Sequence, residues 1–243
     1  MRILIISDLH GNMEAVRALP KDFDEMWVLG DLVTYGPEPA EVVDFVRRNA
    51  RVVLRGNHDN AAGIHTDPRC SDAFKEMASA TLAYTDSQLD DKQRDYLAEL
   101  PLIVERFVQG YRFLLCHATP SDPLFKYCPG DPDCWQSETR DVPANVLLVG
   151  HTHVPFAVHL PQHTVVNPGS LGQPKHGDAK ASYALWEDGR IDLRSCSYSV
   201  TETVRKINAM PVPDRIRRDL ADVLLTGVVP ARLGQREGLA RLF

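Results

Sequence analysis

Short apolar runs that end in Asp, Asn or His recur along this chain, and this pattern constrains its fold more than any other feature. In one of them, residues 146–149 are all apolar, and Gly150-His151-Thr152-His153 follows at once. Four other apolar runs also end in such side chains. Continuous apolar runs are typical of strands buried on both faces, which occur mainly in covered, largely parallel sheets. The repetition therefore predicts an α/β fold with polar side chains at its strand ends.

The first sixty residues predict the order strand, helix, strand, helix, strand. Apolar runs at 3–6, 26–29 and 51–54 predict the strands, and helical spacing at 13–19 and 40–49 predicts the helices between them. In such sheets the binding crevice lies outside the carboxyl ends of the strands. The polar residues after these three strands are therefore expected to meet at one rim: Asp8, His10, Asp31, Asn57 and His58.

The rest of the chain predicts further strands flanked by helices. Residues 71–100 have the spacing of a helical insertion, residues 118–145 that of a long Pro-rich loop, and residues 201–243 that of C-terminal helices. We expect one domain over residues 1–200, with the C-terminal helices packed on it or serving an oligomer contact. The remaining strands are expected at 102–107, 112–116, 156–160, 164–166, 183–187 and 191–197.

Composition narrows the classes of protein. A chain of 243 residues that is 44% hydrophobic and 25% charged is typical of a globular protein. The net charge of −6 disfavours nucleic acid as a partner, because phosphate contacts need clustered Lys and Arg. No apolar run is long enough for a membrane span or a signal peptide. Five cysteines without a framework spacing favour a cytoplasmic location, and Cys128 and Cys134 are expected to be free thiols.

The polar residues at strand ends form a set of seven candidate metal ligands: Asp8, His10, Asp31, Asn57, His117, His151 and His153. Seven ligands are too many for one tetrahedral ion and suit two ions ~3.5–4 Å apart that share a carboxylate. Oxygen and imidazole ligands without a thiolate favour Mn, Fe, Zn, Co or Ni over Ca. Two simpler interpretations stay open at this point: Asp8 could cap a helix that begins near Met13, and the two histidines after residue 149 could belong to an ordinary loop.

Five blocks of the sequence resemble, in order, the signature blocks of the calcineurin-like metallophosphoesterases. These blocks are Asp8-Leu9-His10, Gly30-Asp31, Gly56-Asn57-His58-Asp59, His117 and Gly150-His151-Thr152-His153. The resemblance covers residues 1–197 and implies a four-layer αββα sandwich of two mixed β-sheets. By motif position it implies one ion held by Asp8, His10 and His153, a second held by Asn57, His117 and His151, and Asp31 as the bridge. His58, oriented by Asp59, would lie beside the substrate without binding metal.

The resemblance also implies a reaction, in which a hydroxide between two divalent ions attacks a phosphoester and His58 protonates or stabilises the departing alkoxide. Manganese is the first expectation for the ions, with Fe, Zn, Ni or Co as alternatives. Residues 30–37 lack the Arg that members acting on phosphoproteins or dinucleoside tetraphosphates carry there, and Arg55 is the nearest Arg in sequence. This difference favours small phosphodiesters and the small prokaryotic phosphodiesterase branch. A phosphomonoesterase or nucleotide phosphatase is the alternative, ahead of a nuclease or a catalytically silent metal-binding scaffold.

Overall fold

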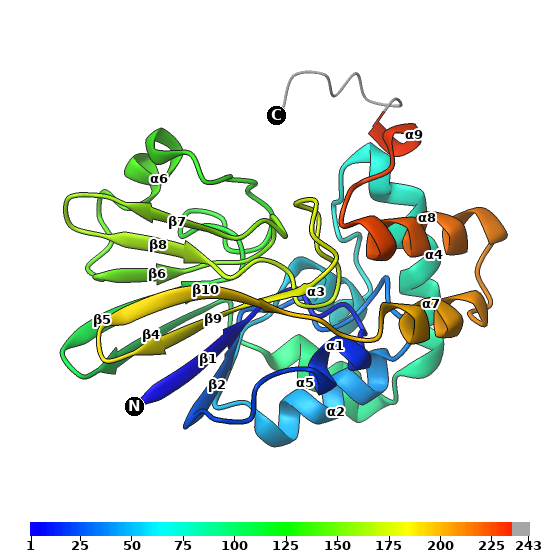
Figure 1. The fold of residues 1–243 in the computed structure, drawn as a ribbon, viewed down its shortest axis with the longest axis horizontal. Helices are drawn as coiled ribbons and strands as arrows, with labels where there is room; N and C mark the ends of the chain where they lie inside the picture. The colour runs from blue at the N-terminus through cyan, green and yellow to red at the C-terminus, as the bar shows by residue number, and fades with distance from the viewer. Residues whose placement is uncertain (235–243) are drawn as a thin grey trace.

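The chain folds into two mixed five-stranded sheets, seen in a computed structural model that describes residues 1–234 (Figure 1). The first sheet has the order β10 (Arg190–Cys196), β9 (Ala181–Glu187), β1 (Arg2–Ile6), β2 (Glu25–Val28) and β3 (Val52–Val53). The second has the order β4 (Ile103–Val108), β5 (Tyr111–Cys116), β6 (Val146–Leu148), β8 (Thr164–Asn167) and β7 (Phe156–His159). The predicted α/β class with two mixed sheets is confirmed.

Strand β1 shows how the apolar runs build the layers, because its side chains alternate between two cores. Ile3 and Ile5 pack in a cluster that also contains Phe113 and other residues of the second sheet. Leu4 and Ile6 point the other way and pack in a cluster with residues of α1 (Met13–Arg17) and α2 (Pro39–Asn49). All four side chains are fully buried. A continuous apolar run is thus required, since both faces of the strand are covered.

Helices cover the outer face of each sheet. On the first sheet, α1, α2 and the C-terminal end of α5 (Asp91–Glu99) share one apolar cluster with the strands. On the second sheet, α6 (Pro132–Glu138) packs Trp135 in a cluster with Leu147 and Val165. The stacking order is therefore helix, sheet, sheet, helix, as the resemblance implied.

The expectation of an unbroken loop over residues 118–145 is wrong, because α6 lies within it. The Asp131 side chain caps this helix by accepting a hydrogen bond from the backbone of Asp133, and Pro132 occupies its first turn. The expectation that Cys128 and Cys134 are free thiols is also wrong. The turn before α6 brings their Cα atoms to 6.3 Å, and a disulfide joins them. The free cysteines among residues 1–234 are Cys70, Cys116 and Cys196.

The helices within residues 72–88 and 200–234 lie together on one side of the sandwich, at the right of Figure 1. The 71–100 segment forms α4 (Asp72–Gln88) and α5, and the C-terminal part forms α7 (Val200–Asn208), α8 (Asp214–Thr226) and α9 (Ala231–Gly234). An apolar cluster joins α4 to α7 and α8 through Met77, Ile207 and Leu220. Residues 235–243 of the expected C-terminal helices lie outside the described residues.

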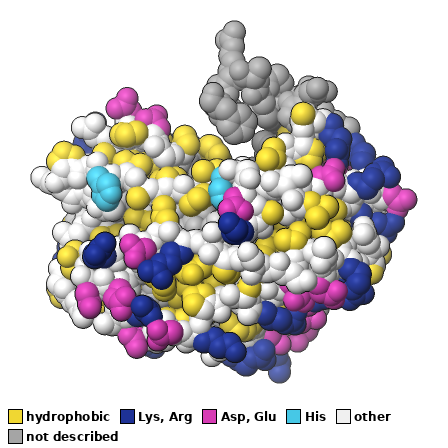
Figure 2. Space-filling view, viewed as in Figure 1, with side chains coloured by type: hydrophobic (Ala, Val, Ile, Leu, Met, Phe, Trp, Pro, Cys, Tyr) yellow, Lys and Arg dark blue, Asp and Glu magenta, His cyan; other side chains and the backbone are white. Residues whose placement is uncertain are grey.

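Two surface properties bear on the classes of partner. Among residues 1–234, no helix combines the length and the apolar character that crossing a bilayer requires. On the face shown in Figure 2, Lys and Arg side chains alternate with Asp and Glu, and no basic stripe forms there.

Candidate metal centre

All seven predicted ligands follow the C-terminal ends of strands, on loops that meet at the centre of the molecule. Asp8 and His10 come after β1, and Asp31 comes after β2. Asn57 begins α3 (Asn57–Ile64), which follows β3. His117 comes after β5, and His151 and His153 come after β6. Six of the seven side chains are buried and His151 is half-buried. The structure thus brings together residues that lie as far apart as 8 and 153 in the chain.

An unusual backbone conformation marks these loops. Five of the seven residues have a positive φ: Asp8 (54°), His10 (44°), Asp31 (57°), His151 (67°) and His153 (62°). L-residues adopt this left-handed region rarely, although Asp, Asn and His tolerate it better than most. Such strained positions concentrate at functional sites, where the surrounding structure holds them. The preference of Asp and His for this region adds a second reason for their presence at these strand ends.

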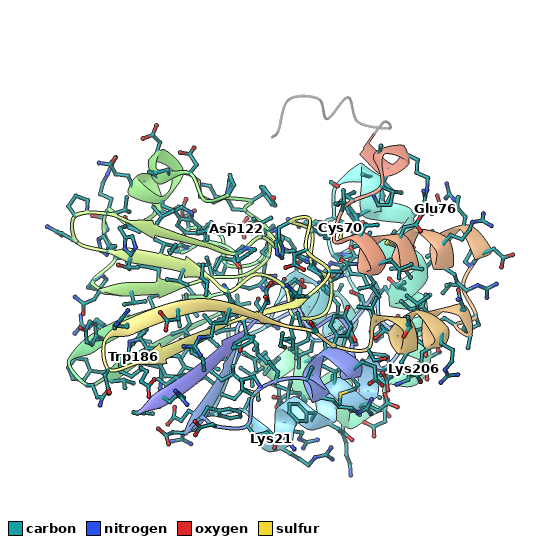
Figure 3. The ribbon with its side chains drawn as sticks, viewed as in Figure 1. Lys21, Cys70, Glu76, Asp122, Trp186 and Lys206 are labelled. Carbon is teal, nitrogen blue, oxygen red and sulfur yellow. A yellow bond between two sulfur atoms is a disulfide. The ribbon has the colours of Figure 1, made fainter. Side chains whose placement is uncertain are left out.

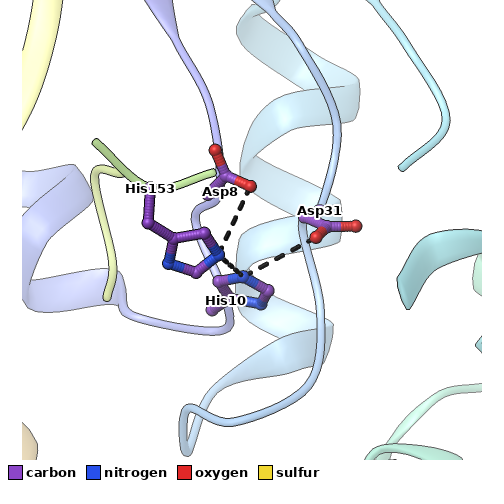
Figure 4. A group of neighbouring side chains, drawn as sticks. All are labelled: Asp8, His10, Asp31 and His153. Carbon is purple, nitrogen blue, oxygen red and sulfur yellow. Dashed lines mark hydrogen bonds and ion pairs between the residues drawn. The ribbon is translucent and has the colours of Figure 1, made fainter. Parts of the chain in front are cut away.

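Asp8, His10, Asp31 and His153 form a tight first group, in which one ligand atom from each lies within 4.8 Å of the others (Figure 4). The Nε2 atoms of His10 and His153 are 3.1 Å apart. Oδ1 of Asp8 lies 3.6 Å from His153 Nε2, and Oδ2 of Asp31 lies 3.7 Å from His10 Nε2. The second oxygen of Asp8, Oδ2, is buried and has no hydrogen-bond partner among the described residues.

The backbone fixes how the imidazoles of this group present their nitrogens. His10 Nδ1 lies 3.0 Å from the Val33 carbonyl, and His153 Nδ1 lies 2.6 Å from the Gln173 carbonyl. Because a carbonyl only accepts hydrogen bonds, each Nδ1 carries the hydrogen, and each Nε2 is left with a free lone pair. Two imidazole lone pairs and two carboxylates, with one ligand atom from each residue within 4.8 Å of the others, are the donor set of a divalent cation. These residues therefore fit the metal that the fold implies.

Asn57, His117 and His151 form a second group beside the first. Asn57 Oδ1 lies 3.2 Å from both His117 Nε2 and His151 Nδ1. His117 donates its Nδ1 hydrogen to the Leu29 carbonyl at 2.8 Å, so Nε2 again faces the site. The Asp31 carboxylate belongs to both groups, because its Oδ2 is also 3.3 Å from His117 Nε2.

Burial, together with neighbouring charges, determines the charge states of the two groups in the metal-free protein. Burial is the larger influence for three of the residues. It lowers the pKa of His10 and of His151 to about 3 and raises the pKa of Asp8 to about 7. His117 differs, because the adjacent Asp31 carboxylate outweighs burial and raises the pKa of His117 to about 9. Burial opposes ionisation of Asp31 too, but the His117 charge holds the pKa of Asp31 well below its usual range.

His58 lies beside the first group, but its partner differs from the predicted one. Thr34 Oγ1 is 2.8 Å from His58 Nδ1, and Cys70 Sγ is 3.4 Å from His58 Nε2. Cys70 lies on the connection between α3 and α4 (Figure 3). The Asp59 carboxylate, expected to orient His58, binds the backbone instead. It accepts hydrogen bonds from the backbone N–H groups of Asp31 (2.7 Å), Leu32 (2.8 Å) and Gly56 (3.0 Å). Asp59 therefore positions the loop that carries Asp31, because its side chain reaches that backbone.

The structure also decides three smaller expectations. Asp8 is not a helix cap, because the Asn12 side chain accepts the hydrogen bond from the backbone of Ala15 at the start of α1. Arg55 is turned away from the centre, since its Nη1 donates to the Ala98 carbonyl at 2.6 Å. The loop after residue 149 is not an ordinary one, because His151 contacts Asn57 and His153 contacts His10, both of which are candidate ligands.

The sequence patterns did not identify four residues that lie near the centre: Thr34, Tyr35, Cys70 and Lys175. The Tyr35 ring is buried, with its centre 4.8 Å from the ring centres of both His10 and His58. Thr34 and Tyr35 both have a positive φ, and the turn-rich stretch after Asp31 was the one signal for them. Cys70 and Lys175 have no local signal, because distant segments bring them to the site.

A sandwich of two mixed sheets with a buried Asp–His–Asn centre at its strand ends defines a metal-dependent hydrolase. The chain belongs to the calcineurin-like phosphoesterase superfamily, whose domain model matches residues 1–188, and it is accordingly a hydrolase of phosphoester bonds.

Comparisons with individual proteins agree with this family. The structure of a metallophosphoesterase from Sphaerobacter thermophilus superposes with a TM-score of 0.79 at 30% identity, over 94% of this chain and 99% of that one. An uncharacterized protein from Methanocaldococcus jannaschii is 28% identical, and the match covers 87% of this chain and 94% of that protein. A protein from Hamiltonella defensa named bis(5'-nucleosyl)-tetraphosphatase, symmetrical, is 24% identical over 89% of this chain and 74% of its own length.

Proposed function

We propose that the protein is a two-metal phosphodiesterase that hydrolyses small phosphodiesters. The observation that carries the proposal is the pair of adjoining ligand groups that share Asp31. Asp8, His10 and His153 would hold the first ion, and Asn57, His117 and His151 would hold the second. The mixture of carboxylate, amide and imidazole ligands suits manganese, with Fe, Zn, Ni or Co as alternatives. When bound, two such ions supply an activated water at neutral pH and neutralise the phosphoryl oxygens.

His58 is the residue that we assign to the leaving group. Burial lowers the pKa of His58 to about 4, so its imidazole is neutral near pH 7. When the Thr34 hydroxyl donates to Nδ1, the hydrogen of His58 resides on Nε2 and can form a hydrogen bond to the departing oxygen, which stabilises the negative charge that develops there. A hydrogen-bond donor aimed at a developing negative charge contributes about 10²–10³-fold. Thr34 is then a positioning residue, and His58 is the catalytic residue.

The preference for diesters rests on the loop after Asp31. Thr34 and Tyr35 occupy the stretch in which an Arg would bind a terminal phosphate dianion through two parallel hydrogen bonds. Tyr35 is buried between two imidazoles, and Arg55 is engaged with α5. A phosphodiester needs no such clamp, because it carries a single negative charge. The internal phosphates of a dinucleoside tetraphosphate also have two bridging oxygens each, so the name of the Hamiltonella defensa relative adds this class to the substrates worth testing.

The test compares two chromogenic substrates, bis(4-nitrophenyl) phosphate and 4-nitrophenyl phosphate, with added manganese and with chelator. Diester cleavage that exceeds monoester cleavage and disappears with chelator supports the proposal. Faster cleavage of the monoester would assign a phosphatase instead. No turnover of either ester, or of a dinucleoside tetraphosphate, would favour a metal-binding scaffold. Digestion of a labelled oligonucleotide in the same assay would reveal a nuclease, which the interspersed charges of the face in Figure 2 do not favour.

A further inference from the structure

Lys175 lies next to the metal centre on the loop between β8 and β9. Gln173, two residues earlier on the same loop, accepts the hydrogen bond from His153. The Lys175 Nζ lies 4.3 Å from the centre of the Phe74 ring and 5.7 Å from the centre of the Tyr35 ring. The Tyr35 ring in turn contacts His10 and His58. The Tyr35 ring therefore separates this ammonium group from His10, a candidate ligand, and from His58, the residue that we assign to the leaving group.

The Lys175 ammonium group has an unusual environment for a cation. Among the side chains that the structure describes, which do not include that of Asp72, no carboxylate oxygen comes within 4.0 Å of its Nζ, whereas Lys126, Lys180 and Lys206 each form an ion pair with Asp or Glu. Two aromatic faces hold it by cation–π attraction, which fixes the position of a charge without neutralising it. This attraction does not neutralise the ammonium group, so its charge and its N–H groups can act on an anionic ligand.

Two candidate metal ligands are among the groups that interact electrostatically with Lys175. Burial lowers the pKa of Lys175 to about 8, and the opposing influences come from Cys70, Asp8 and Asp31. The side chain therefore still carries most of its charge near pH 7, and two of the groups that act on it are candidate metal ligands. An anion at the centre would meet this ammonium group beside His58.

We propose that Lys175 binds a non-bridging oxygen of the substrate phosphate and so supplies the cation that the loop after Asp31 lacks. This inference rests on the proposed function. An ammonium group is a compact charge that suits one oxygen, whereas a guanidinium suits two. One such contact matches the single charge of a phosphodiester. Lys175 is accordingly a substrate-binding residue that separates this chain from relatives with an Arg clamp.

The test compares Lys175→Met with Lys180→Met. Lys175→Met keeps the apolar stem beside Tyr35 and Phe74 but removes the charge. Lys180 is exposed on the same loop and pairs with Asp178, so its replacement is a matched control. Calorimetry measures the binding of inorganic phosphate to each manganese-loaded protein, and kinetics measure KM and kcat for bis(4-nitrophenyl) phosphate.

For Lys175→Met we expect phosphate affinity to fall and KM to rise by about 10- to 100-fold, the range of a hydrogen bond to a charged group. Manganese content should be unchanged, Lys180→Met should match the wild type, and Lys175→Arg should recover part of the affinity. Phosphate affinity and KM within about twofold of wild type in Lys175→Met would overturn the proposal, as would loss of manganese. If the wild type cleaves no phosphoester, the proposed function fails, and phosphate calorimetry alone still decides the role of Lys175.

Discussion

The Nε2 atoms of His10 and His153 lie 3.1 Å apart, although the hydrogen of each ring resides on Nδ1. Two lone pairs at this distance repel each other unless a positive charge lies between them. Burial lowers the pKa of His10 to about 3 and holds the pKa of His153 well below its usual range, so a shared proton is not that charge near pH 7. Two imidazole nitrogens that bind one zinc-like ion at ~2.0–2.1 Å lie roughly 3.0–3.4 Å apart. The observed separation therefore suits two ligands of one ion, as we propose for His10 and His153.

The shared position of Asp31 leads to the first prediction. Asp31→Asn preserves the shape of the side chain but removes the negative charge that both ligand groups use. Because residues that merely support a ligand contribute about 10- to 100-fold, loss of this ligand should lower turnover by at least about 100-fold. Metal content should also fall, while circular dichroism should show an intact fold. Asp95→Asn, the same change on the exposed side of α5, is the control. An Asp31→Asn protein with near wild-type turnover would refute the two-metal mechanism.

Metal binding should also release protons, because His117 must lose its proton to act as a ligand. The pKa of His117 is raised to about 9 in the metal-free protein, so the ring is charged at pH 7.5. A histidine is charged below its pKa, and the release should therefore disappear as the pH rises through about 9. Titration of manganese into metal-free protein at pH 7.5, in buffers of different ionisation enthalpy, should show about one proton released per chain. A heat that does not depend on the buffer would contradict this assignment.

The strands and the grouping of the candidate ligands could be predicted from the sequence because both depend on local patterns. Strand β1 needs a continuous apolar run, since Ile3 and Leu4 enter different cores. Asp8 and Asp31 come together because they follow the C-terminal ends of β1 and β2, which are parallel neighbours and end at the same edge of the sheet. These relationships hold whatever the intervening loops do.

The supporting contacts could not be predicted, because they depend on how distant loops fold over the centre. The pairing of Thr34 with His58 requires a positive φ at Thr34, which sequence propensity disfavours for a β-branched residue. Lys175 reaches Tyr35 across 140 residues of sequence, from a loop with no motif of its own. The disulfide at Cys128 depends on the turn that leads into α6, a helix too short for its pattern to be seen.

Gly56 should be irreplaceable for a steric reason alone. Its φ of −87° is accessible to any residue, but a Cβ there would lie 2.1 Å from Asp31 Oδ1 and 2.4 Å from the Asp31 backbone nitrogen. Gly56→Ala should therefore displace Asp31 and lower metal affinity and turnover by at least about tenfold. Gly110→Ala is the control, because its Cβ would meet nothing within 4 Å. That alanine, at a φ of +87°, should cost about 1 kcal/mol of stability without a loss of turnover per folded molecule. Normal metal content in Gly56→Ala would contradict the argument.

Thr34 should act on the leaving group through His58. The residue is buried at a φ of 67°, a strained conformation for a β-branched side chain, and its hydroxyl contacts His58 Nδ1 at 2.8 Å. Thr34→Val keeps the shape and removes the hydroxyl, so the imidazole loses the partner that fixes its orientation. We expect kcat to fall by about 10- to 100-fold with metal content unchanged, and Thr34→Ser to retain most of the activity.

The leaving group distinguishes this role from a structural one. A 4-nitrophenolate leaves readily without assistance, whereas a departing alkoxide depends on a hydrogen-bond donor that stabilises its charge. Thr34→Val should therefore slow the cleavage of methyl 4-nitrophenyl phosphate, from which nitrophenolate departs, much less than it slows the cleavage of a dialkyl phosphate. Equal losses on both substrates would show that Thr34 supports the loop and not the chemistry. His58→Ala removes the same hydrogen-bond donor directly. The double variant that combines Thr34→Val with His58→Ala should therefore cleave the dialkyl substrate no more slowly than His58→Ala alone.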